Sequence, residues 1–152
     1  MKLFNQPECF RELNDRLDYV QADNPHKWGK MNAPQMICHL TDSFRGVMGR
    51  KPMEIPGGHF GRRLMKWIAL STPTKWPQGV PTRPEIDQFI GGTPPGDFEA
   101  DKRDLKAIMA EFVQQPRGFE FRPHPIFHEM TEQEWMRWGY RHMDHHLRQF
   151  GC

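Results

Sequence analysis

Three of the chain's eight histidines lie within five residues of one another, in the segment His142-Met143-Asp144-His145-His146. At about 100° per residue on a helix, His142 and His146 share an apolar face, whereas His145 falls toward the boundary with the polar face. Imidazoles at positions i and i+4 have Cβ atoms about 5 to 6 Å apart, so both rings can reach one metal ion. The spacing therefore indicates a divalent metal site, and its alternative is a pair of hydrogen-bonded structural histidines.

The structural alternative carries a physical cost. Two imidazoles buried side by side must stay neutral with satisfied nitrogens, or suffer desolvation and mutual repulsion when they are charged. A metal ion relieves both problems, and a helical bundle builds such a site with a further ligand from a facing helix. The candidate for that ligand is His39, between Met36 and Leu40 at the edge of an apolar stripe. Three histidines leave coordination positions open, as catalytic zinc sites do.

Residues that favour the start of a helix mark the first two predicted helices of the bundle. Pro7 favours a first helical position, and the apolar spacing after it predicts a helix over 7–21. Asn32 and Gln35 form a predicted capping box for a second helix, which carries His39 and ends near residue 48.

The middle of the chain is predicted to be mostly loop. The stretch 49–96 holds 16 of the 27 Gly and Pro residues, and these residues interrupt regular structure. The stretch 71–96 is expected to be irregular, forming a packed cover that shapes the mouth of a pocket. Ahead of it, apolar residues at helical spacing predict one short helix of about three turns: Phe60, Leu64, Trp67 and Ile68.

Two longer helices follow this connection. Asp97 is placed to cap a helix that stops before Pro116. Thr131 and Glu134 form a second predicted capping box, which begins a last helix that carries the histidine segment and runs to Phe150. Four main helices, one short helix and a long Gly/Pro-rich connection together predict an all-α bundle.

Composition and charge agree with this fold class and exclude others. The chain has 18 aromatic residues and 10 Met but only 11 Val and Ile, so residues favoured in strands are scarce. Its 152 residues predict one domain over 1–152. A net charge of +2 does not indicate a basic surface that binds nucleic acid. No apolar run approaches the roughly 20 residues of a membrane span, and three cysteines without a C-x-x-C pair predict reduced thiols, so we expect a cytoplasmic protein.

The histidine pattern resembles a known signature. The run His142-x-x-His145-His146-x-x-Gln149, with the isolated His39 in the second helix, is similar to that of the DinB/YfiT-like superfamily of metal-binding four-helix bundles. Further blocks over nearly the whole chain resemble one branch of that superfamily, a domain of unknown function: Trp28-Gly29-Lys30-Met31, Gln35-Met36-x-x-His39, Thr82-x-Pro84-Glu85, His124-Pro125-x-Phe127 and the closing His-His-Leu-Arg-Gln-Phe.

The resemblance implies a divalent ion, Zn or Ni, held by His39, His142 and His146, with Gln149 one turn beyond the last ligand. Superfamily members with assigned activities are thiol-dependent transferases or isomerases, in which the metal holds a low-molecular-weight thiol as thiolate; others are described as metal-dependent hydrolases. We therefore expect a metal-dependent enzyme that hydrolyses a small-molecule substrate or transfers a low-molecular-weight thiol. The alternatives are a non-catalytic metal-binding bundle with a stress-related role and a metal-free structural bundle.

Two more histidines and the oligomeric state complete the predictions. His124 is the candidate catalytic residue, as a proton shuttle, and its alternative role is a hydrogen bond within a turn. His128 stands where the resembled branch usually continues His-Pro-x-Phe with Gly, so the turn entering the last helix is expected to differ. Related bundles are often dimers, and the Met-rich and aromatic-rich composition leaves apolar surface for a homodimer.

Overall fold

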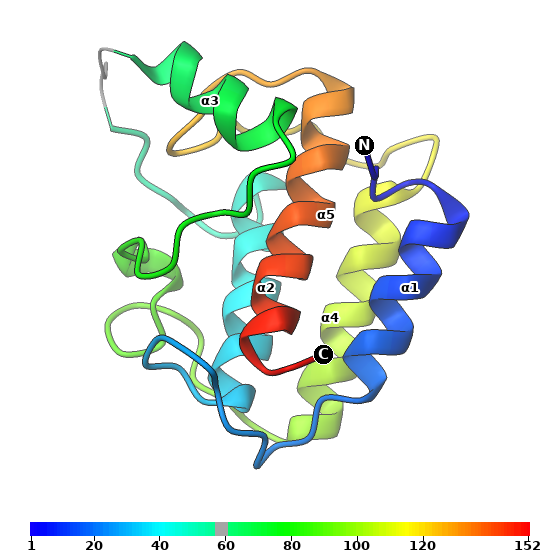
Figure 1. Cartoon of the computed structure of the whole chain (residues 1–152), viewed down its shortest axis with the longest axis vertical. Coiled ribbons are helices and arrows are strands. Elements are labelled where there is room, and N and C mark those ends of the chain that lie inside the picture. Colours follow the sequence, from blue (N-terminus) through cyan, green and yellow to red (C-terminus); the bar gives the residue numbers. More distant parts are fainter. Residues whose placement is uncertain (57–60) are drawn as a thin grey trace.

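The computed structural model describes residues 1–56 and 61–152, and this part of the chain folds as the predicted all-α bundle. Four long helices run side by side, and a shorter helix and a 3-10 turn lie outside them (Figure 1). Within the described ranges there is no strand, and no helix is long and apolar enough to cross a membrane. In chain order the elements are α1 (Pro7–Asp18), α2 (Ala33–Val47), α3 (Arg62–Ser71), η1 (Pro84–Ile86), α4 (Phe98–Val113) and α5 (Glu132–Gln149).

The predicted capping groups begin three of the long helices. Asn32 and Gln35 form the complete capping box of α2, and Thr131 and Glu134 form that of α5. The Asp97 carboxylate accepts a hydrogen bond from an amide in the first turn of α4. These caps satisfy backbone N–H groups that have no partner inside a helix, so local sequence determines the three start positions.

Helix α1 is shorter than predicted. The sequence predicts a helix over 7–21, but α1 ends at Asp18. Val20, which belongs to the predicted apolar face, is buried by a turn in which its amide donates to the carbonyl of Leu17. The Lys102 ammonium on α4 then donates to the Val20 carbonyl at 3.1 Å. The chain therefore buries the Val20 side chain without continuing the helix. Apolar spacing alone does not distinguish a longer helix from a helix followed by a turn.

Helix α3 is confirmed, but its apolar stripe faces outward. Leu64, Trp67 and Ile68 have exposed fractions of 61, 58 and 44%. Leu70, on the other side of the helix, is fully buried against the core. Phe60, the remaining member of the predicted stripe, lies outside the described residues. Helical spacing thus identified the helix without identifying which of its faces the bundle covers.

An aromatic cluster forms the part of the core where the N-terminal segment packs against α5. Phe4, fully buried ahead of α1, contacts the rings of Phe44 on α2 and Phe112 on α4 at centroid distances of 5.7 and 5.9 Å. Gly139 on α5 allows this approach, because a Cβ there would lie 2.6 Å from Phe4 and 3.1 Å from Phe112. The absence of one methyl group therefore lets three elements share a single aromatic cluster.

The connection between α3 and α4 is packed on the bundle only in part, since Val80 and Ile90 have exposed fractions of 55 and 71%. The contacts at its end are the clearest. Asp42, fully buried on α2, accepts hydrogen bonds from the amide and hydroxyl of Thr93 at 2.7 and 2.8 Å. The same carboxylate pairs with Lys51 at 3.2 Å. Because a buried carboxylate requires such partners, Asp42 holds the end of the connection against α2. The 3-10 turn η1 within this connection was not predicted.

We expect Gly139→Ala to lower the free energy of unfolding by about 1 to 3 kcal/mol, because overpacking a rigid aromatic cluster outweighs a gain of about 1 kcal/mol in helix propensity. Denaturant unfolding followed by circular dichroism measures the difference. Gly118→Ala is the matched control, since a Cβ at Gly118 meets no atom within 4 Å. An unfolding midpoint for Gly139→Ala at or above that of the wild type would contradict the described packing.

Candidate metal centre

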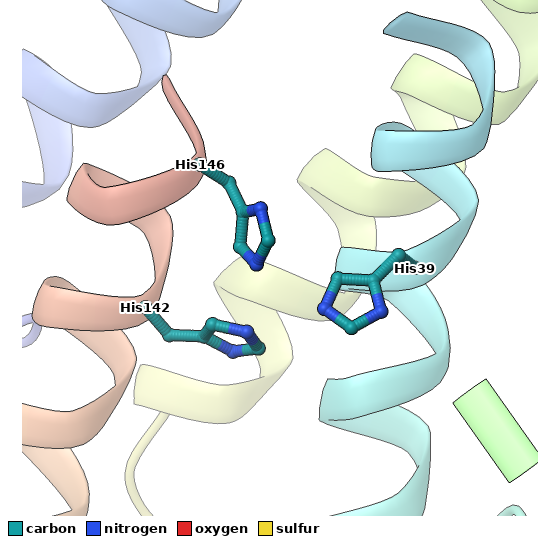
Figure 2. A group of neighbouring side chains, drawn as sticks. All are labelled: His39, His142 and His146. Atoms are coloured by element: carbon teal, nitrogen blue, oxygen red, sulfur yellow. The ribbon is translucent and has the colours of Figure 1, made fainter. Parts of the chain in front are cut away.

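Helices α2 and α5 bring three histidines into one buried group. His39 comes from α2, while His142 and His146 come from successive turns of α5, and the three rings converge in the space between the helices (Figure 2). One candidate ligand atom from each residue lies within 4.8 Å of the other two. The side chains are almost completely buried, with exposed fractions of 4, 9 and 8%. The structure thus gathers the three histidines that the sequence singled out.

The connection between α3 and α4 orients the His39 ring. His39 Nδ1 lies 2.8 Å from the carbonyl oxygen of Ile86, the last residue of η1. A carbonyl oxygen only accepts hydrogen bonds, so Nδ1 carries the proton and Nε2 keeps its lone pair. The nitrogen available to a ligand is therefore Nε2.

Gln149 orients the His146 ring. His146 Nδ1 lies 3.0 Å from Gln149 Oε1, and the Gln149 amide nitrogen donates to the Trp28 carbonyl at 2.6 Å. The second bond determines which end of the amide faces the ring, so Nδ1 donates and Nε2 again keeps the lone pair. Gly29, at φ 83°, lets the loop come this close, because a Cβ there would lie 2.5 Å from the Gln149 amide nitrogen.

His142 lies between two indole rings. Its ring centroid is 5.1 Å from that of Trp138 and 6.0 Å from that of Trp76. The His142 Nδ1 atom is buried and has no hydrogen-bond partner among the described residues. Buried polar atoms are nearly always satisfied, so an orphaned imidazole nitrogen beside two further imidazoles is an observation that a bound ion or ordered water would explain.

Burial keeps these three imidazoles neutral at neutral pH. Desolvation lowers the pKa of His39, and it lowers the pKa of His142 and of His146 well below the ordinary value of 6.5. The charge that each histidine would place on its neighbours lowers the pKa of the latter two further. Neutral imidazole is the form that ligates a metal ion, so protons do not compete for the nitrogens at pH 7.

The donor set fits a divalent ion with coordination positions left open. The group consists of three nitrogen donors, and imidazole suits Zn, Ni, Cu and Fe. His39 and His146 each donate their other ring N–H to a carbonyl or amide oxygen, which is how metal-binding histidines are usually held. Three protein ligands are the number found in catalytic zinc sites, whereas closed structural sites use four.

His145 lies beside this group without belonging to it. Its ring contacts His146 at a centroid distance of 5.1 Å, and it also contacts Trp28 at 5.8 Å and Trp76 at 6.2 Å. The two indoles come from different connections, one before α2 and one after α3. His145 therefore occupies the predicted boundary position on α5, under side chains that cover one flank of the histidine group.

His124, the candidate for proton transfer, lies in a turn ahead of α5. Its Nδ1 accepts hydrogen bonds from the amides of Ile126 and Phe127 at 3.1 and 3.2 Å. Its ring stacks on Phe127 and contacts Trp138, which in turn contacts His142. These contacts give His124 the turn-forming role that was its alternative, and proton transfer stays a prediction.

His128 adopts the backbone conformation that a glycine would adopt in this turn, and the expected difference of the turn stays a prediction. Its φ of 57° lies in the left-handed region that favours glycine, the residue usual at this position in that branch. Histidine is among the residues that occur there, at a cost of about 1 kcal/mol. The backbones of His128 and His124 bond to each other in both directions, and His128 Nε2 donates to the Pro56 carbonyl at 3.2 Å.

Two groups that orient the site were not predicted from the sequence. The Ile86 carbonyl is a backbone group, which every residue has, so no side-chain pattern marks it. The role of Gln149 had a signal that was not used, since residues three apart on a helix are neighbours and the amide follows His146 by three positions. The covering position of Trp76 comes from an irregular segment without periodicity.

Comparison with known proteins identifies the family of this chain but no activity. A family model described as "Protein of unknown function (DUF1569)" matches residues 9–151. No curated protein and no solved structure matched the chain. The expected similarity to a family of unknown function is confirmed at this level, and the wider DinB/YfiT-like relationship stays a prediction.

We expect His124→Leu to lower the free energy of unfolding by about 1 to 3 kcal/mol, because it leaves two buried amides without an acceptor. His124→Asn should retain most of the stability, since a side-chain oxygen can accept from the same two amides. Thermal and denaturant unfolding of both variants measures the effect. Equal stability of His124→Leu and the wild type would contradict the turn-forming role.

Acid should remove the advantage of the wild type over His124→Asn. Burial lowers the pKa of His124 to about 3 from 6.5, so between these values the unfolded chain binds a proton that the folded chain does not. The contribution of His124 is therefore complete above pH 6.5 and is lost as the pH falls toward 3. We expect the free energy of unfolding of the wild type to fall by about 1 to 2 kcal/mol relative to that of His124→Asn between pH 7 and pH 5. A constant difference over this range would refute the prediction.

Proposed function

Because the chain belongs to the DUF1569 family, whose function is unknown, we propose its function from its own site: a metal-dependent enzyme in which His39, His142 and His146 hold a divalent ion. The single observation that carries the proposal is the convergence of three buried, neutral imidazoles whose candidate ligand atoms lie within 4.8 Å. Charged side chains that could neutralise such an ion are not part of the group.

The chemistry follows from this donor set. When bound, a divalent ion held by three neutral imidazoles acts as a Lewis acid that lowers the pKa of a water or thiol and supplies a nucleophile near neutral pH. Zn and Ni are the ions we expect, since both accept imidazole ligands. The reaction class is hydrolysis of a small molecule or transfer of a low-molecular-weight thiol.

The protein's own residues prepare the site for this chemistry. The Ile86 carbonyl and the Gln149 amide hold two rings with Nε2 available. The indoles of Trp28 and Trp76 cover the flank of the group beside His145 and keep bulk water away from it. Exclusion of water strengthens every electrostatic interaction at the centre.

We also propose that the chain is a member of the DinB/YfiT-like superfamily. The support is the placement of its histidines, one on the second long helix and two on the last, in a bundle of four long helices. The thiol-transfer and hydrolysis classes come to this chain through that resemblance. The burial of all three histidines favours one alternative, a metal-binding bundle without turnover.

Metal content is the first measurement. Untagged protein should contain about one ion per chain after loading with Zn²⁺ or Ni²⁺, and His39→Ala and His142→Ala should each lose it, because two imidazoles do not complete the site. Elemental analysis gives the stoichiometry. His26→Ala is the matched control, since His26 is exposed and lies outside the group.

Two outcomes of this measurement would overturn the proposal. Wild-type protein that stays empty after loading would remove the metal centre and leave the histidines structural. Retention of the ion by both variants would place it elsewhere. Loaded protein that turns over neither esters nor thiol acceptors would instead establish the non-catalytic alternative.

Gln149→Leu should weaken metal affinity by about 10- to 100-fold, because His146 loses the acceptor that holds its tautomer. Gln149→Glu keeps an acceptor oxygen and should restore most of the affinity. Competition with a chelator of known affinity measures both variants. Equal weakening in the two would contradict a role for the acceptor, and so would unchanged affinity in Gln149→Leu.

A further inference from the structure

A hollow of about 180 Å³ lies against α5, outside the histidine group. Its lining includes four cationic side chains and one indole: Lys2, Lys75, Arg141, Arg148 and Trp76. Asp144 is the only acidic residue among the lining residues. The walls of the hollow are therefore strongly cationic, although the chain as a whole has a formal charge of only +2.

Internal partners neutralise two of these cations. Lys2 pairs with Glu12 at 2.5 Å, and Arg148 pairs with Asp144 at 2.9 Å. Asp144 also pairs with Arg16 at 2.9 Å, so its single charge is shared between two guanidinium groups. The carboxylates of Glu12 and Asp144 therefore already have cationic partners.

Arg141 and Lys75 lack such a partner. Arg141 donates to the carbonyl oxygens of Thr72 and Thr74, which are neutral, and within the described ranges neither Arg141 nor Lys75 forms an ion pair with a carboxylate. Arg141 is half-buried, and the nearby Asp144 carboxylate is already paired with Arg16 and Arg148. A half-buried guanidinium that forms no ion pair, beside a carboxylate shared by two other guanidinium groups, is an arrangement that a further anion stabilises.

Trp76 forms a wall shared by the hollow and the histidine group. Its Nε1 donates to the Ala69 carbonyl at 2.9 Å, which fixes the indole on the bundle. The ring lies 5.8 Å from the Arg141 guanidinium carbon and 6.0 Å from the ring centroid of His142. One indole therefore contacts both the Arg141 guanidinium and a histidine of the candidate metal centre.

The chemistry of the two cations defines the ligand class. A guanidinium has five N–H donors in one plane, and Arg141 donates from two of its nitrogens to the carbonyl oxygens of Thr72 and Thr74. Its remaining N–H groups are those that can bind carboxylate or phosphate oxygens. A lysine ammonium adds a mobile charge that adjusts to the same oxygens. A hollow of this volume accommodates a small molecule or one end of a larger one.

We propose that this hollow binds the carboxylate or phosphate group of a small anionic molecule through Arg141 and Lys75. Its identification as the anchoring site for the enzyme's substrate, with the reactive part directed toward the histidine group, rests on the proposed function. Oxyanion binding itself does not depend on the metal. The substrate would then be an organic anion.

Binding of inorganic phosphate to the full chain tests the proposal. The indole N–H signal of Trp76, assigned with Trp76→Phe, is followed by NMR while phosphate replaces chloride at constant ionic strength. We expect a saturable shift in the millimolar range, at least a tenfold loss of affinity in Arg141→Gln and a smaller loss in Lys75→Gln. Arg103→Gln, an exposed cation on α4, is the matched control and should bind as the wild type does.

Further controls keep the test independent of folding and of the metal centre. Arg141→Lys keeps the positive charge but loses the planar guanidinium group. It should therefore restore part of the phosphate affinity that is lost in Arg141→Gln. Wild-type protein treated with a metal chelator should bind phosphate as untreated protein does, whether or not the metal centre exists. The absence of a saturable shift in the wild type would overturn the proposal. So would Arg141→Gln and Lys75→Gln variants that bind phosphate as tightly as the wild type does. Phosphate binding in a protein that takes up no metal would leave the hollow established and the metal-dependent function refuted.

Discussion

The burial of three neutral imidazoles at one point is the constraint on which this structure depends. Each ring removed from water loses the hydration of two polar nitrogens, and charging any one of them would place a cation beside its neighbours. Two of the rings have hydrogen-bond acceptors: the Ile86 carbonyl for His39 and the Gln149 amide oxygen for His146. His142 keeps one nitrogen without a partner in the described part of the chain. The cluster is therefore neutral, two of its rings are oriented by acceptors, and the buried Nδ1 of His142 is unsatisfied within the described residues.

Helices supply the positions of these rings, whereas connections supply their orientation. Figure 1 shows α2 and α5 adjacent along the bundle, and each contributes histidines at positions that its own periodicity fixes. One acceptor, the Ile86 carbonyl, belongs to the connection after α3. The other, Gln149, is the last residue of α5, and it is held by the Trp28 carbonyl in the connection before α2. Gly29 and η1 are thus as much a part of the site as the helices, although neither contributes a side chain to it.

Sequence reasoning succeeded where local rules decide the structure. The capping boxes at Asn32 and Thr131 and the shared face of His142 and His146 follow from helix geometry, and the structure has them. It failed where tertiary contacts decide, as at Val20, where a turn replaces the last turn of a predicted helix, and at Trp67, whose apolar side chain faces out. The partner of His39 is a backbone carbonyl, and such a group has no signature in the sequence.

The hydrogen bond between His39 and Ile86 spans 47 positions of the chain, and that separation has a consequence for assembly. Helices and their caps form from neighbouring residues, whereas closing a long segment costs entropy before its contacts compensate for it. The pairing of α2 with α5 closes a still longer segment, since His39 and His142 are 103 positions apart in the chain. The position of the His39 ring and its tautomer therefore both depend on contacts between distant parts of the chain. A fragment that holds a single helix and its caps contains neither the facing histidines nor the carbonyl that orients this ring.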